Sequence, residues 1–223
     1  MSNARRIALG SALSIALAVA LLSSSFAADA PPRSAADARL VDQLAPGQTI
    51  TKNGMTITLH QKNAGARDAS GWYAASSTRG HFTMRFRGPF NDATFVQKTK
   101  DGLTFTTHNL SSRAPDGLTV VVVCIERSDR KVPPDSVVGA VEEFARISKP
   151  FYSQPFTRGN ISGIEYRGIW PNGDHYAGQM FITGEALCQI MAGFPDMPLE
   201  PIPESVRQTI DSFRSIAPAS PTH

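Results

Sequence analysis

The chain is poor in the residue patterns that mark metal sites. It contains only two cysteines and five histidines among 223 residues, and none of them forms a C-x-x-C, H-x-x-x-H or H-E-x-x-H spacing. Zinc sites commonly show such spacings. We therefore expect no metal site, because His60, His81, His108 and His175 would have to meet acidic residues from distant segments to form one.

Motifs for nucleophiles and phosphates are also missing. No G-x-S-x-G run is present, and no glycine-rich loop follows a predicted strand and opens a helix. The run Ser128-Asp129-Arg130-Lys131 fits S-x-x-K, but its polar setting before Pro133-Pro134 is typical of a solvated loop. Glu142 and Glu143 are adjacent, so in a helix they point to different sides. We expect no catalytic residue and no cofactor.

An excess of one charge is missing from the predicted mature chain. Residues 1–27 contain Arg5 and Arg6 and no acidic residue, so their removal leaves 20 Lys and Arg against 19 Asp and Glu. These charges are dispersed singly, whereas a surface that binds nucleic acid concentrates Lys and Arg on one face. The sequence therefore argues against nucleic acid as a partner.

The N-terminus has the three parts of a secretory signal peptide. Arg5 and Arg6 precede an apolar stretch at 7–22, and small residues follow it in the endings Ser25-Phe26-Ala27 and Ala28-Asp29-Ala30. An anchor helix needs about 20 mostly apolar residues, which this stretch does not supply. We predict a signal peptide at 1–27, no membrane anchor after its cleavage, and a periplasmic or secreted protein.

The two cysteines, Cys124 and Cys188, lie outside the signal peptide. In an oxidising compartment an even pair is most simply a disulfide. The alternative is that both are buried free thiols in neighbouring strands.

Periodicity places one domain at 47–216, between a flexible leader at 28–46 and a disordered tail at 217–223. Alternation and turn residues predict strands at 48–52, 55–60, 81–87, 94–99, 103–109, 118–126, 162–170, 175–182 and 186–193. Apolar residues at helical spacing predict a helix after Pro134-Asp135-Ser136 and another at 203–215. The order predicts an α+β fold, an α/β/α sandwich with a mostly antiparallel sheet, preceded by a short β-hairpin at 48–60.

Several segments in this order resemble the Mog1/PsbP-like fold, an α/β/α sandwich. The resemblance covers 80–216 and uses the strand at 80–90, the hairpin leading to 120–123, the helix after Pro133-Pro134, the strand at 161–168 and the closing helix at 205–216. The hairpin at 48–60 departs from the pattern. Since members of that family are binding or assembly modules, the resemblance implies such a role and supplies no catalytic residues.

The segment 158–178 is the richest in aromatic and arginine residues, which give large contact area at low entropic cost. It predicts a contact surface for a ligand or partner, with Trp170 and Tyr176 foremost. The alternative is that Tyr166 and Tyr176 pack as partners on neighbouring strands. The candidate contact residues are Arg158, Tyr166, Arg167, Trp170, His175 and Tyr176.

Export, a substantial core and the missing catalytic motifs together predict a non-catalytic binding or accessory module of the bacterial envelope. Its partner would be an envelope protein or a small ligand. Two alternatives stay open: a periplasmic hydrolase whose site is assembled from scattered residues, and a structural subunit of an envelope complex.

The predicted cleavage can be tested on the exported protein. We expect a mature N-terminus between Ala28 and Pro31, because the small residues there suit signal peptidase. Mass spectrometry of protein recovered from the periplasm or the medium measures it. Recovery of chains that still begin at Met1 or Ser2 would contradict the prediction.

Overall fold

The structure, a computed structural model, describes residues 41, 43–100, 102–129, 132–133 and 135–216. The predicted signal peptide, the tail at 217–223 and most of the leader at 28–46 lie outside these residues. Within the described part of the chain, no helix is long and apolar enough to cross a bilayer.

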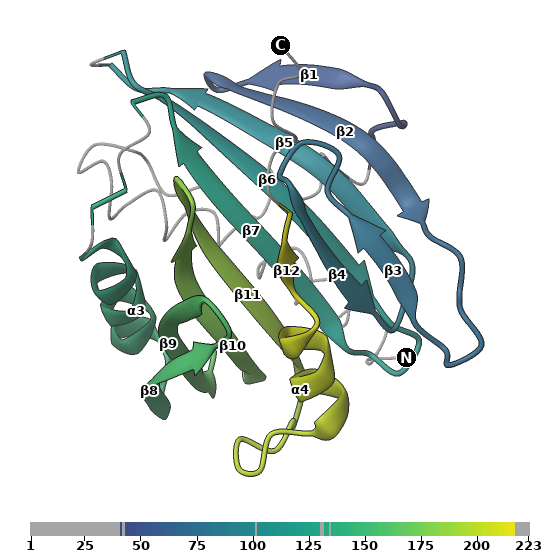
Figure 1. The fold of residues 1–223 in the computed structure, drawn as a ribbon, viewed down its shortest axis with the longest axis vertical. Coiled ribbons are helices and arrows are strands. Elements are labelled where there is room, and N and C mark those ends of the chain that lie inside the picture. Colours follow the sequence, from purple (N-terminus) through teal and green to yellow (C-terminus); the bar gives the residue numbers. More distant parts are fainter. Residues whose placement is uncertain (1–40, 42, 101, 130–131, 134, 217–223) are drawn as a thin grey trace.

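Nine strands form one antiparallel sheet in the order β1-β2-β5-β6-β7-β11-β10-β9-β8 (Figure 1). They are β1 (Thr49–Lys52), β2 (Met55–Ala64), β5 (Phe90–Lys98), β6 (Thr104–Arg113), β7 (Thr119–Arg127), β8 (Phe151–Arg158), β9 (Ile161–Ile169), β10 (Asp174–Thr183) and β11 (Ala186–Pro195). Asn53 and Gly54, with φ of 52° and 74°, form the tight turn that the sequence predicts between β1 and β2.

A three-stranded sheet and α4 lie in front of the large sheet in Figure 1. This small sheet has the order β12-β4-β3 and consists of β3 (Tyr73–Ser76), β4 (Phe82–Phe86) and β12 (Arg214–Ser215). The helix α4 (Glu204–Asp211) precedes β12 directly, and α3 (Ser136–Ile147) packs on β8, β9 and β10.

The core has two layers because β7 is apolar on both faces. Val120, Val122 and Cys124 pack with the small sheet and with Val206 and Ile210 of α4. The alternate residues, Val121, Val123 and Ile125, pack in the cluster that contains Phe144 of α3. A strand buried on both faces is what the continuous apolar run at 120–125 predicts.

The predicted α/β/α sandwich is wrong. Among the described residues twelve strands stand against two helices, which have 12 and 8 residues. The face expected to carry a helical layer is covered largely by the small sheet, whose strands β3 and β12 have four and two residues. Such short segments show too little alternation to be recognised as strands. The apolar stripe that predicts the closing helix ends at Phe213, and the next two residues, Arg214 and Ser215, pair with β4.

The β1–β2 hairpin is also more than an addition ahead of the fold. Strand β2 pairs with β5 and so extends the large sheet. Val41 and Leu44, which the sequence assigns to the leader, are buried in a small cluster with Ile57 and Leu59. The hairpin and the end of the predicted leader therefore belong to the packed structure.

The large sheet ends at β8, a strand absent from the sequence prediction. Pro155 lies in the middle of β8, opposite Ile164 of β9. Proline has no N–H to donate, so it fits an edge strand where that position faces away from the sheet. Pro155 also hinders pairing of a further strand with β8, which explains why a segment that contains Phe151 and Tyr152 can form an exposed edge.

The predicted disulfide is confirmed. Cys124 of β7 and Cys188 of β11 are opposite each other in the antiparallel register, with Cα atoms 4.1 Å apart, and their sulfurs are bonded. Both are buried. The bond therefore joins the two central strands of the large sheet inside the core.

Reduction of this bond is expected to destabilise the protein. The cysteines are 64 residues apart in sequence, and closure of a loop of that length is worth roughly 4 kcal/mol on the chain-entropy model. Urea unfolding with and without reductant measures the loss, and the oxidised chain should run faster on a denaturing gel. Two titratable thiols per chain in unfolded, unreduced protein would contradict the bond.

Candidate functional site

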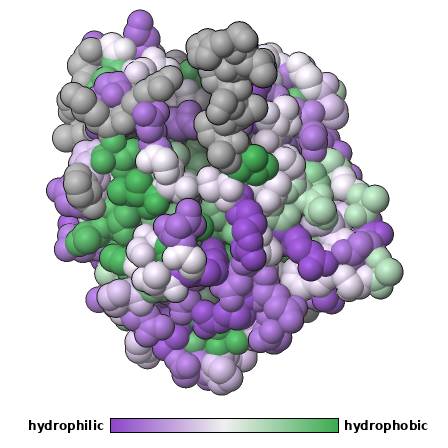
Figure 2. Space-filling view, in the orientation of Figure 1, coloured by the Kyte–Doolittle hydropathy of each residue, from purple (hydrophilic) through white to green (hydrophobic). Residues whose placement is uncertain are grey.

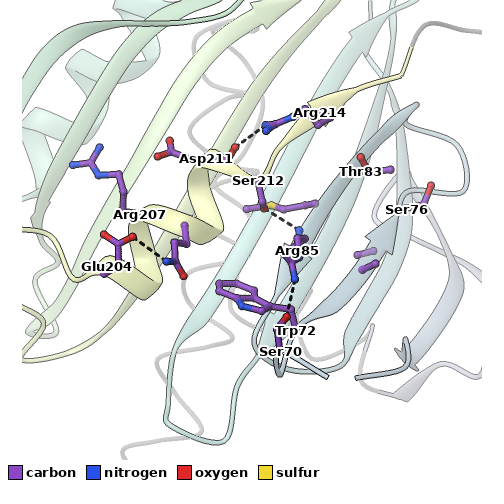
Figure 3. Close-up of a pocket in the computed structure, with 14 residues that line it drawn as sticks. Ser70, Trp72, Ser76, Thr83, Arg85, Glu204, Arg207, Asp211, Ser212 and Arg214 are labelled. Atoms are coloured by element: carbon purple, nitrogen blue, oxygen red, sulfur yellow. Dashed lines mark hydrogen bonds between the residues drawn. The ribbon is translucent and has the colours of Figure 1, made fainter. Parts of the chain in front are cut away.

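A groove of about 920 Å³ lies between α4 and the small sheet (Figure 3). One side is formed by α4 and the residues that follow it, and the other by β3, β4 and the loop before β3. Hydrophilic side chains gather around α4 on this face of the molecule (Figure 2). The lining residues are Ser70, Trp72, Ala74, Ala75, Ser76, Thr83, Met84, Arg85, Glu204, Arg207, Gln208, Asp211, Ser212 and Arg214.

Alternation along β4 produces the floor of the groove. Phe82, Met84 and Phe86 are buried toward the large sheet, so Thr83 and Arg85 point outward. The small residues Ala74 and Ser76 are the exposed positions of β3. Because most of these outward side chains are small, the surface beside α4 is hollow.

Arg85 is held by an acidic turn at the end of the groove. Its Nη2 donates to Asp68 Oδ2 at 2.9 Å and to Ser70 Oγ at 3.1 Å. The guanidinium groups of Arg85 and Arg87 lie 5.2 and 5.3 Å from the ring centroid of Trp72. Charge pairing and cation–π contact thus fix the direction of the Arg85 side chain.

Asp68 is the acid of this turn. Hydrogen bonds from the Ser70 hydroxyl and the Trp72 backbone N–H, with Arg85 beside it, lower the pKa of Asp68 from 3.8 to about 2. The carboxylate therefore stays ionised across the ordinary pH range. It anchors the loop and has no proton to give at neutral pH.

The rim on the helix side comes from one face of α4, where Glu204, Arg207, Gln208 and Asp211 recur at spacings of three and four. Arg207 Nη1 donates to Glu165 Oε2 at 2.7 Å, and Arg158 Nη1 donates to Asp211 Oδ1 at 2.7 Å. Both bonds join α4 to the β8–β9 end of the large sheet.

Arg214 differs from the other arginines of the groove. Its Nη1 donates to the backbone carbonyls of Asp211 and Phe213. Among the described residues no carboxylate pairs with it, and its residue is exposed. Its positive charge is therefore available to a ligand, and it lies near the C-terminal end of α4, which favours cations.

A second pocket, of about 410 Å³, lies over the β8–β9 end of the large sheet. It is lined by Phe151, Tyr152, Ser153, Gln154, Glu165, Tyr166 and Arg167. The guanidinium of Arg167 lies 5.5 Å from the ring centroid of Tyr152 and also pairs with Glu200. This pocket is mixed in charge and polar.

The three aromatic residues predicted as contacts are buried. Tyr166, Trp170 and Tyr176 pack around Phe144 of α3. Tyr176 faces Gly168 and Tyr166 faces Gly178 in the strand register, and a Cβ at either glycine would collide with the tyrosine. These glycines therefore serve cross-strand packing, and burial raises the pKa of both tyrosines.

The other three predicted contacts have partners of their own. Arg158 pairs with Asp211, Arg167 with Glu200, and His175 Nδ1 bonds to the carbonyl oxygen of Met197. Arg167 lines the second pocket and Arg158 supports the wall of the groove through Asp211. The structure does not bring the six residues to one surface, and their role in contact stays a prediction.

His60 and His108 are partnered by different groups. His60 bonds to Thr94 Oγ1 at 2.8 Å, and His108 lies 3.8 Å from Glu126 Oε2. Within the described ranges no three His, Cys, Asp or Glu side chains converge as metal ligands.

Sequence reasoning missed the residues that form the groove, above all Trp72, Arg85 and Arg214. Arg85 belongs to a strand that the alternation of Phe82, Met84 and Phe86 predicts, so its outward direction follows from the sequence. The sequence does not show that Arg85 faces α4, because this helix is more than a hundred residues away along the chain.

No protein-family description matches the chain, and no curated protein matches it. Among solved structures, the chain is similar to cyanobacterial PsbP (CyanoP) from Synechocystis sp. PCC 6803, with a TM-score of 0.43 and 12% identity. The match covers 68% of this chain and 96% of that chain. The resemblance to the Mog1/PsbP-like fold seen in the sequence stays a prediction, because a TM-score below 0.5 does not test it. A likeness of this size carries neither a partner nor an activity to this chain.

The lowered pKa of Asp68 predicts a dependence of stability on acid pH. Its folded-state pKa of about 2 lies below the ordinary value of 3.8, so its stabilising contribution is complete above that value and is lost as pH falls toward 2. We expect Asp68→Asn to be less stable than the parent near neutral pH, with a difference that shrinks below pH 3.8 and disappears as the pH falls through about 2. Urea midpoints of both proteins across this range measure it, and a constant difference would contradict it.

Proposed function

We propose that this protein is an exported, non-catalytic binding module, and that an extended, acid-bearing segment of an envelope partner docks in the groove beside α4. The observation that carries the proposal is a groove with a floor of small side chains and arginines on both walls. The unpaired charge of Arg214 and the fixed guanidinium of Arg85 favour a carboxylate of the partner.

The dimensions of the groove support an extended segment. The wall that α4 supplies has eight residues, which at 1.5 Å per residue is about 12 Å. An extended chain covers that length with roughly four residues. A segment of this size can lie over Ala74, Ser76 and Thr83 and still reach Arg214.

Pre-organisation of the walls also supports binding. Arg85 and Arg207 are held by Asp68 and Glu165, so little side-chain entropy is lost when a ligand contacts them. The exposed pair of Arg85 with Asp68 adds little to stability, whereas the pair of Arg207 with Glu165 involves a buried carboxylate. The more important consequence of the two pairs is that both guanidinium groups are already oriented before a ligand binds.

The hydrolase alternative receives less support. The carboxylate at the end of the groove, Asp68, is held ionised by its neighbours, and the two tyrosines with raised pKa values are buried in the core on the other face of the sheet. Neither environment suits an acid or base that must exchange protons near neutral pH. A structural subunit of an envelope complex could use the same groove. That role differs from the proposal only in that the partner would stay bound permanently.

Site-specific photocrosslinking in the producing cell tests the proposal. A photoreactive side chain at Gln208, which is exposed in the groove, is expected to give an adduct of discrete mass whose partner peptide contains Asp or Glu. The substitution Arg214→Glu should reduce that adduct at least several-fold, because it places a negative charge where the partner's acid is expected.

The matched control is the same photoreactive group at Thr49, an exposed residue of β1 in the hairpin outside the groove. Equal labelling at both positions, an unchanged adduct with Arg214→Glu, or a partner peptide without acidic residues would overturn the proposed docking mode.

A further inference from the structure

A row of polar side chains crosses three strands at the second pocket, from exposed Gln154 at the edge to buried Glu165 and Gln179. Gln154, Glu165 and Gln179 are opposite one another on β8, β9 and β10. The side chain of Glu165 is only 7% exposed. It accepts one short bond, from Arg207, and two long ones, at 3.3 Å from Gln179 and 3.4 Å from Gln154. Bonds of that length are weak, so the row can still engage a ligand.

Two buried atoms near this row have no partner in the described part of the chain. They are Arg167 Nε, a donor, and Gln179 Oε1, an acceptor. Arg167 is two residues from Glu165 on the same face of β9, and Gln179 is beside Glu165 in the row. Buried polar atoms nearly always have hydrogen-bond partners, and Arg167 lines the pocket, so its unused donor points to a group bound there.

The charges of the pocket cancel in pairs. Glu165 is paired with Arg207, and Arg167 is paired with Glu200. An anionic ligand would meet Glu165, and a cationic ligand would meet Arg167. The pocket therefore suits a neutral ligand that both donates and accepts hydrogen bonds.

The rim of the pocket carries an aromatic ring. Tyr152 is 51% exposed, although large aromatic side chains are usually well covered. It is opposite Arg167 in the register, and the guanidinium of Arg167 approaches its ring. An exposed ring beside buried amide and carboxylate groups offers an apolar platform next to a hydrogen-bonding floor.

We propose that the β8–β9 pocket binds one unit of a neutral saccharide, whose hydroxyls bond to Gln154 and Glu165 while its C–H face packs on Tyr152. A hydroxyl both donates and accepts, so it can satisfy acceptors and donors of the same site. A pyranose ring also has an apolar face that an aromatic side chain covers. The pocket shares no lining residue with the groove, so this site stands whether or not a partner docks beside α4.

Backbone amide NMR of the full mature chain with chitotetraose and with maltotetraose tests the proposal. The two sugars share pyranose hydroxyls and differ in the acetamido group and in the configuration of the linkage, so the arms distinguish a β-linked amino-sugar polymer from an α-linked glucan. At least one sugar is expected to shift the amide signals of 151–154 and 165–167 in a saturable way.

Variants then separate the pocket from other sites. Tyr152→Ala and Gln154→Ala are expected to weaken the saturable shifts at least several-fold. Both side chains belong to exposed residues of an edge strand, so the fold should persist. Thr157→Ala is the matched control on the same strand, because Thr157 alternates to the opposite face.

The possible outcomes decide the proposal. Saturable shifts in the pocket that Tyr152→Ala and Gln154→Ala reduce and Thr157→Ala leaves unchanged support it. Shifts located elsewhere, equal effects of all three variants, or no shifts with either sugar overturn it. In the last case ordered water would be the group that satisfies Arg167 Nε and Gln179 Oε1.

Discussion

Burial of β7 and β11 on both faces is the constraint on which the rest of the structure depends. These strands are joined by the Cys124–Cys188 bond and carry apolar side chains toward two clusters. An antiparallel sheet with such a centre needs a cover on each side. One cover is α3 with the aromatic cluster, and the other is assembled from the small sheet and α4. Because the second cover consists of two separate elements, a groove runs between them.

The position of α4 determines the geometry of both candidate sites. Three arginine–carboxylate pairs join this helix and the residue Glu200 ahead of it to the β8–β9 end of the sheet. The exposed pairs contribute little free energy each. The pair of Arg207 with buried Glu165 is different, since removing one partner would leave a buried charge without compensation. This pair also connects the two sites, because Arg207 lines the groove and Glu165 lines the pocket.

The aromatic segment at 158–178 illustrates how one pattern can indicate two structures. Tyrosines and tryptophan beside glycines and arginines are typical of contact surfaces. The same composition is what two adjacent strands need when each tyrosine lies across from a glycine, as Tyr166 does with Gly178 and Tyr176 with Gly168. Burial of the rings against Phe144 agrees with this second interpretation.

Elements with local signals can be predicted from the amino-acid sequence. Asn53-Gly54 specifies a hairpin, the alternation of Phe82, Met84 and Phe86 specifies a strand with Arg85 on its outer face, and the run at 120–125 specifies a central strand. The tertiary structure alone decided that a three-stranded sheet covers the face assigned to helices, because β3 and β12 become strands only through pairing with β4. It also decided that Arg85 faces α4 and that Glu165 meets Arg207. Those contacts join residues 42 or more positions apart, and no local periodicity encodes them.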